Sequence, residues 1–167
     1  MSQSCCAPRA SWTWLDATHQ LMILAGVLLA IVVSGPVYSD DELASYRIVD
    51  GAIPEPLTEH PGNPERGRHI VRDRDRGDCA ICHAMPLPQR GFHGTIGPPL
   101  DGIGSRATAG VLRLRLVDPK ALNPATIMPA YYKIEGLYRV LERYRARPIL
   151  TAQQIEDVIA YLLTLTD

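Results

Sequence analysis

The stretch GDCAICHAMP, residues 77–86, holds the residues on which the interpretation of this chain depends. Cys79, Cys82 and His83 form the pattern Cys-x-x-Cys-His within it. Two cysteines at this spacing occur in zinc sites, in redox dithiols or disulfides, and in the covalent attachment of haem. The surrounding sequence discriminates between these possibilities.

The zinc and redox alternatives find little support elsewhere in the chain. Structural zinc takes four nitrogen or sulfur ligands, usually from two pairs of residues, and no second cysteine pair or His-x3–5-His pair occurs beyond residue 39. A thioredoxin-like dithiol requires a βαβ context, which the sequence does not show, and a structural disulfide would make His83 incidental. The pattern is instead the signature of c-type haem attachment. Cys79 and Cys82 would form thioethers to the vinyl groups, and His83 would bind the iron.

A haem that transfers electrons in the low-spin state needs a second axial ligand, and methionine raises its potential relative to histidine. Met85 is only two residues from His83, so it cannot easily reach the opposite face of the ring. Met128 lies 45 residues after His83 in a loop framed by prolines, which would present its side chain stiffly. Met128 is therefore the predicted sixth ligand, and His93 is the competing candidate.

The ring nitrogen of a ligating histidine that faces away from the metal generally donates to an acceptor, which fixes the tautomer. The segment GTIGPPLDG, residues 94–102, supplies a Gly-Pro turn with suitable carbonyl groups. We expect the Pro98 carbonyl to accept from His83; a plain turn is the alternative.

Helix signals flank this region, and no repeat or strand pairing is evident. A first helix is expected over residues 63–75, because Asn63 is a good N-cap and a proline follows it. A second is expected over 109–117 and a basic helix over 136–146. The 24 residues from 84 to 107 form a long Gly- and Pro-rich loop, and wrapping around a cofactor is one reason for such a loop.

The last helix has the clearest signal. Thr151 and Gln154 form a capping box, and apolar residues follow with helical period. Gly67 of the first helix and Tyr161 of the last are the residues at which these two helices are expected to cross closely. The pattern predicts an all-α domain.

The N-terminal part is expected to be a signal peptide. The apolar run at 21–33 has 13 residues, fewer than the roughly 20 that span a bilayer, and cleavage is predicted after Ser39. An uncleaved membrane anchor is the alternative. Export would leave a Pro-rich extended arm at 40–62 and a domain at 63–167, with Cys79 and Cys82 as the remaining cysteines. The formal net charge of −1 gives no sign of nucleic-acid binding.

With these residues in place, the sequence resembles the monohaem class I cytochromes c and, more closely, the SoxX subunits of the periplasmic sulfur-oxidation cytochrome SoxAX. The more general features are the Cys-x-x-Cys-His and GPxL patterns, which many cytochromes c share. The segments that carry the closer resemblance are AIPEPL (52–57), GDCAICHAMP (77–86), IGPPLDGIGSR (96–106), LRLRLVDPKALNPATIMPAYYK (112–133) and RPILTAQQIEDVIAYLLTL (147–165).

The resemblance implies a class I cytochrome c-like fold of about four helices wrapped around one covalently attached haem c. It also implies a periplasmic electron-transfer subunit that forms a heterodimer with a SoxA-type cytochrome. Such a complex acts as an L-cysteine S-thiosulfotransferase, joining thiosulfate oxidatively to a cysteine of the SoxYZ carrier and passing electrons to a downstream acceptor. The sulfur-bearing cysteine would then belong to the partner. The alternative is a freely diffusing periplasmic electron carrier.

Overall fold

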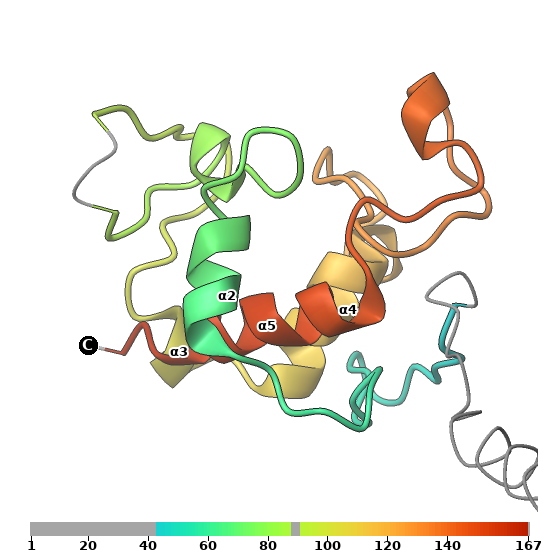
Figure 1. Cartoon of the computed structure of the whole chain (residues 1–167), viewed down its shortest axis with the longest axis horizontal. Helices are drawn as coiled ribbons and strands as arrows, with labels where there is room; N and C mark the ends of the chain where they lie inside the picture. The colour runs from blue at the N-terminus through green and yellow to red at the C-terminus, as the bar shows by residue number, and fades with distance from the viewer. Residues whose placement is uncertain (1–42, 88–90, 167) are drawn as a thin grey trace, which may run out of the picture. The chain divides into compact units, whose positions relative to one another are not determined.

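Four α-helices joined by long loops make up the regular structure of residues 43–87 and 91–166, which are the residues that the structure, a computed structural model, describes (Figure 1). The predicted all-α class is confirmed: within these residues the only β pairing is an isolated bridge between Val49 and Ala52. No helix among them is long and apolar enough to cross a membrane. The predicted signal peptide, 1–39, lies outside the described residues. The elements are α2 (Pro64–Ile70), η1 (Cys79–Ile81), α3 (Ile103–Arg106), α4 (Ala109–Val117), η2 (Pro119–Ala121), η3 (Glu142–Tyr144) and α5 (Ala152–Leu163), where η marks a single turn of 3-10 helix.

The crossing of α2 and α5 is the closest contact between helices, and it occurs where the sequence predicts it. A Cβ on Gly67 would lie 2.0 Å from the Asp157 carbonyl oxygen and 2.9 Å from the Tyr161 Cβ. Only glycine therefore lets the two backbones approach this far. Asp157 reinforces the contact, because its carboxylate accepts from the Asn63 N–H and, at 2.7 and 2.8 Å, from the Arg66 guanidinium.

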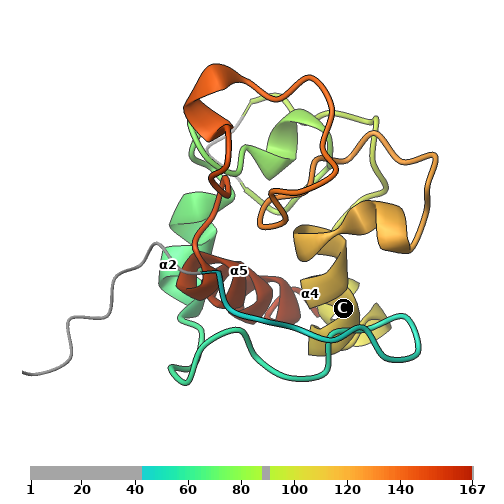
Figure 2. The same ribbon diagram turned by 90° about the vertical axis from the view of Figure 1, so that its right-hand side faces the viewer.

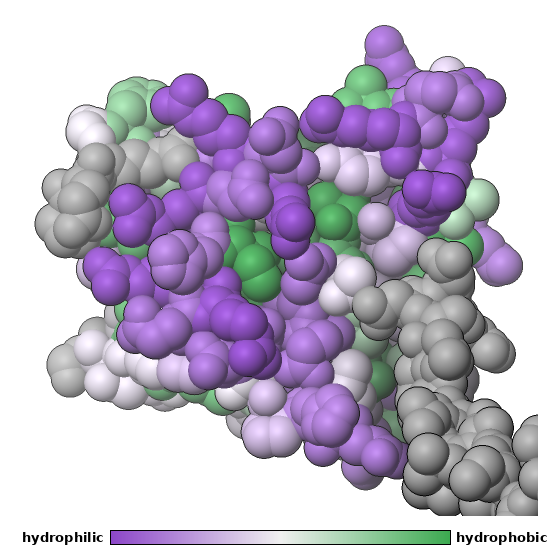
Figure 3. Space-filling model, in the orientation of Figure 1, coloured by the Kyte–Doolittle hydropathy of each residue, from purple (hydrophilic) through white to green (hydrophobic). Residues whose placement is uncertain are grey.

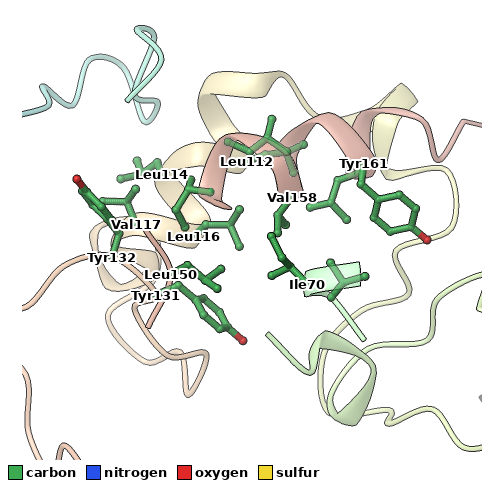
Figure 4. Close-up of a cluster of buried hydrophobic side chains, with 14 of the residues drawn as sticks. Ile70, Leu112, Leu114, Leu116, Val117, Tyr131, Tyr132, Leu150, Val158 and Tyr161 are labelled. Atoms are coloured by element: carbon green, nitrogen blue, oxygen red, sulfur yellow. The ribbon is translucent and has the colours of Figure 1, made fainter. Parts of the chain in front are cut away.

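Helix α5 begins at the predicted capping box. The Thr151 hydroxyl accepts from the Gln154 N–H, and the Gln154 side chain accepts from the Thr151 N–H. Its apolar face is buried in a cluster with residues of α2, of α4 and of the segment around Tyr131 and Tyr132, part of which Figure 4 shows. Each buried leucine or isoleucine stabilises the fold by ~1.5–3 kcal/mol. The α5 residues that contribute are Ile155, Val158, Ile159 and Leu162.

A buried ion pair attaches the Pro-rich arm to the helices. Arg113 of α4 and Glu156 of α5 are 4% and 6% exposed, and they form two hydrogen bonds of 2.7 and 2.8 Å. Arg113 also donates to the Ile53 carbonyl at 2.7 Å, and Glu156 accepts from the Leu57 N–H at 2.9 Å. Since the Ile53 and Leu57 side chains are buried as well, this part of the arm belongs to the core of its own domain.

Two helix predictions were wrong in extent or kind. The first helix ends at Ile70 instead of residue 75, because the chain then turns back so that the Cys79 N–H donates to the Val71 carbonyl. The basic segment 136–146 is a loop with one turn, η3. Leu137, Tyr138 and Leu141 of this segment are exposed, and a short helix with little tertiary packing is unstable. Helix α3, inside the predicted long loop, was not anticipated.

Candidate haem site

The turn η1 brings the two cysteines and His83 together. The Cys82 and His83 N–H groups both donate to the Cys79 carbonyl, at 3.2 and 2.9 Å. Both cysteines are half-buried and form no disulfide. The turn is fixed to the end of α2, because a Cβ on Gly77 would lie 2.5 Å from the Ile70 carbonyl oxygen. The two thiols are therefore presented side by side on a tightly attached turn.

The loop that follows holds the His83 ring at one nitrogen. His83 Nδ1 lies 2.7 Å from the Pro98 carbonyl oxygen, so the Nδ1–H donates to it and Nε2 is the nitrogen left to act as an acceptor or ligand. A Cβ on Gly97 would come within 2.3 Å of the ring. The Gly97 N–H donates to the Cys82 carbonyl at 2.8 Å. Gly97 and Pro98 thus set the plane and the tautomer of the imidazole together.

Met128 sits in a loop that is held at both ends. Its N–H donates to the Thr126 hydroxyl at 3.2 Å, and its half-buried side chain packs against the core. Before it, Lys120 donates to the Pro124 and Thr126 carbonyls at 3.1 and 2.9 Å. After it, the Tyr131 N–H donates to the Leu116 carbonyl at 2.8 Å. The prolines predicted a stiff loop, but no sequence pattern indicated that Lys120 would close it.

Tyr131 joins the methionine loop to the cysteine turn. It is buried, and its hydroxyl donates to the Gly77 carbonyl at 3.1 Å. Burial raises the pKa of Tyr131, so the hydroxyl stays protonated and remains a donor. Sequence reasoning missed this residue; its only signal was an aromatic side chain three positions after Met128.

The competing candidates occupy different surroundings. Met85 is 5% exposed and belongs to the hydrophobic core. His93 is half-buried, and its Nδ1 has no hydrogen-bond partner among the described residues. Within residues 43–87 and 91–166, no group of three or more His, Cys, Asp or Glu side chains could hold a metal ion.

The donor set fits a covalently attached haem. It comprises two cysteines on one turn that form no disulfide, an imidazole whose Nδ1 is already hydrogen-bonded, and a thioether in a braced loop. Large apolar side chains next to these residues are exposed, with Ile81 at 56%, Ile96 at 67% and Ile127 at 80%. Two cysteine thiols, one imidazole and one thioether are the groups that a haem c with His and Met ligands requires.

Comparison with known proteins agrees with this assignment. The family model for cytochrome c matches residues 64–166. The chain belongs to the cytochrome c family. Among solved structures, this cytochrome c is similar to a crystal structure of SoxXA from P. pantotrophus, with a TM-score of 0.68 and 42% identity over 73% of this chain and 95% of that chain. A comparison with curated proteins gave no match.

These findings confirm three expectations from the sequence. The cytochrome is of the SoxX type, its fold is that of an all-helical class I cytochrome c, and its cofactor is one covalently bound haem c. Its role is electron transfer.

Proposed function

We propose that this cytochrome is the periplasmic electron-transfer subunit of a SoxAX-type complex, which joins thiosulfate oxidatively to a cysteine of a SoxYZ-type carrier. The observation that carries the proposal is the donor set of η1 and the methionine loop in a chain 42% identical to one of SoxXA. The carrier and the downstream electron acceptor follow from the resemblance to the SoxX family.

The site residues are assigned by their chemistry. Cys79 and Cys82 would hold the haem by thioethers, and His83 Nε2 and Met128 Sδ would bind its iron. The Pro98 carbonyl, 2.7 Å from His83 Nδ1, keeps that ring in one tautomer and raises its basicity as a ligand. When bound, the haem supplies a centre that takes up and releases one electron at a time.

The electron count of the reaction limits what this subunit contributes. Joining a thiol to the outer sulfur of thiosulfate forms one S–S bond and releases one proton and two electrons. A single one-electron centre must pass the first electron on before it accepts the second, or share the pair with its partner. Residues 40–167 contain no cysteine besides Cys79 and Cys82. Once both are thioethers, the sulfur-bearing cysteine must lie on another chain.

The test is to purify the native cytochrome and follow its absorption spectrum with thiosulfate. We expect it to co-purify with a second haem subunit, and to become reduced only when that subunit and the carrier are both present. A strictly monomeric protein in its native extract would contradict the proposal. It would favour the freely diffusing electron carrier instead.

A further inference from the structure

Residues 134–148, here called the arginine loop, extend away from α4 and α5 (Figures 1 and 2). The loop leaves just after Lys133, whose N–H donates to the Val117 carbonyl at 3.2 Å. It returns at Leu150, which is 2% exposed and donates to the Tyr131 carbonyl at 2.9 Å. Both ends are therefore anchored in the core, while the segment between them lies outside it.

The loop nevertheless has a defined shape. Gly136, Arg139 and Ala146 adopt left-handed backbone conformations, with φ of 66°, 59° and 52°, and two of these are not glycine. Tyr144 donates to the Asp75 carbonyl at 2.7 Å, and the Arg143 guanidinium lies 4.9 Å from the centre of the Tyr144 ring. Unfavourable backbone conformations outside the core persist only where surrounding contacts enforce them, and they gather at functional segments.

Its surface combines apolar and cationic side chains. Tyr138 is 89% exposed and Leu141 63%. Residues 134–148 contain four arginines and two glutamates, a formal charge of +2, in a chain whose net charge is −1. One of these glutamates, Glu142, is already paired with Arg145 at 3.1 Å. Figure 3 shows strongly hydrophilic residues over this corner of the molecule.

The Pro-rich arm is another candidate for a partner contact, but much of it packs against its own domain. Ile53 and Leu57 are buried in the core of their own domain, and Arg113 and Glu156 bind their backbone. Ile48 and Val49, at 46% and 41%, are the large apolar residues of the described arm that remain exposed. The arginine loop presents its apolar side chains more fully.

We propose that the arginine loop is the surface on which the SoxA-type subunit docks, an inference that rests on the proposed function. Tyrosine and arginine are enriched at stable interfaces and dominate their binding energy. Permanent interfaces are more hydrophobic than transient ones, so exposed Tyr138 and Leu141 suit a partner that stays bound. The partner surface that fits is an apolar hollow with an acidic rim.

The location of the loop agrees with electron transfer across this contact. Tyr144 binds the Asp75 carbonyl, and Tyr131, next to the base of the loop, binds the Gly77 carbonyl. Both acceptors lie in the short segment that leads into Cys79. A partner seated on the loop is thereby held beside the segment that carries the haem.

The experiment co-expresses the cytochrome with the SoxA-type subunit of its own source organism and measures the affinity of the purified pair. We expect Tyr138→Ser with Leu141→Ser to weaken binding by tenfold or more, as the loss of a hot-spot residue at the centre of an interface does. The matched control, Ile48→Ser with Val49→Ser in the arm, should bind like the wild type. Both variants should keep the low-spin haem spectrum, which shows that they fold.

Charge reversal and salt separate a stable interface from a transient one. Arg139→Glu with Arg147→Glu should lower the association rate of the two subunits more than it raises their dissociation rate. The wild-type complex should survive about 0.5 M NaCl, where charges are screened beyond a few ångströms. The inference is overturned if the loop variants bind normally, if the arm control alone loses binding, or if salt dissociates the wild-type pair. A wild-type chain that binds no SoxA-type subunit at all overturns the proposed function too.

Discussion

Glu156→Gln tests the buried ion pair that holds the arm, α4 and α5 together. Glutamine matches glutamate in volume, so the variant removes charge without opening a cavity. Its amide group would place a donor against Arg113, which is 4% exposed and bonded to both Glu156 oxygens. Removing one partner of such a pair costs about 3–5 kcal/mol, because the remaining charge stays buried and unpaired.

A loss of that size is a large fraction of the stability of a domain, which is generally ~5–15 kcal/mol. For a domain of roughly 125 residues, it lowers Tm by on the order of 10–20 °C. Far-UV circular dichroism of the haem-loaded protein, on heating and in guanidinium, measures both quantities. The matched control is Glu142→Gln, which removes an exposed pair with Arg145 and should cost less than ~1 kcal/mol. If both variants lost the same free energy of unfolding, burial would not be the reason that the Arg113–Glu156 pair stabilises the domain.

Three further changes have defined outcomes. Gly67→Ala should destabilise the domain by ~1–3 kcal/mol in chemical denaturation, since its Cβ meets backbone on α5, whereas Gly91→Ala, with nothing within 4 Å, should not. Met128→Ala should lower the reduction potential and alter the visible spectrum, and an unchanged spectrum would place the ligand elsewhere. Burial raises the pKa of Asp157, but bonds from Arg66, Asn63 and Gln153 outweigh it and hold that pKa below 3.8. The ionised Asp157 carboxylate therefore stabilises the fold above about pH 4, and this stabilisation is lost as the pH falls further. Asp157→Asn should make the free energy of unfolding less dependent on pH in the acid range. A pH dependence equal to that of the wild type would contradict this.

Local signals in the sequence predicted the parts of the fold that depend on neighbouring residues. The capping box at Thr151 and the apolar period after it placed α5, and residues 109–117 form α4 as expected. Glycine at position 67 predicted the close approach of α2 and α5. The Cys-x-x-Cys-His pattern identified the haem-binding family because its chemistry depends on spacing alone.

Features that depend on distant contacts could not be predicted in this way. Arg113 lies in the run LRLRL, where an arginine ordinarily faces solvent. Its burial is favourable only because Glu156, from another helix, pairs with it. The segment 136–146 has helical composition, but helix formation there would need a surface to pack on. Lys120 and Tyr131 brace the methionine loop through carbonyl groups, which carry no signature in the sequence.

The contact between α2 and α5 also bears on the order in which the protein matures. Arg66 and Asp157, which meet at the crossing, are 91 residues apart, and a helix of seven residues is unstable by itself. Helix α2 is therefore stable only once the last helix has folded against it. Until then, the turn η1, which is bonded to the end of α2 at Val71, is not yet folded. Both thiols are accessible for haem attachment during that interval, so the covalent bond can form before the fold closes around it.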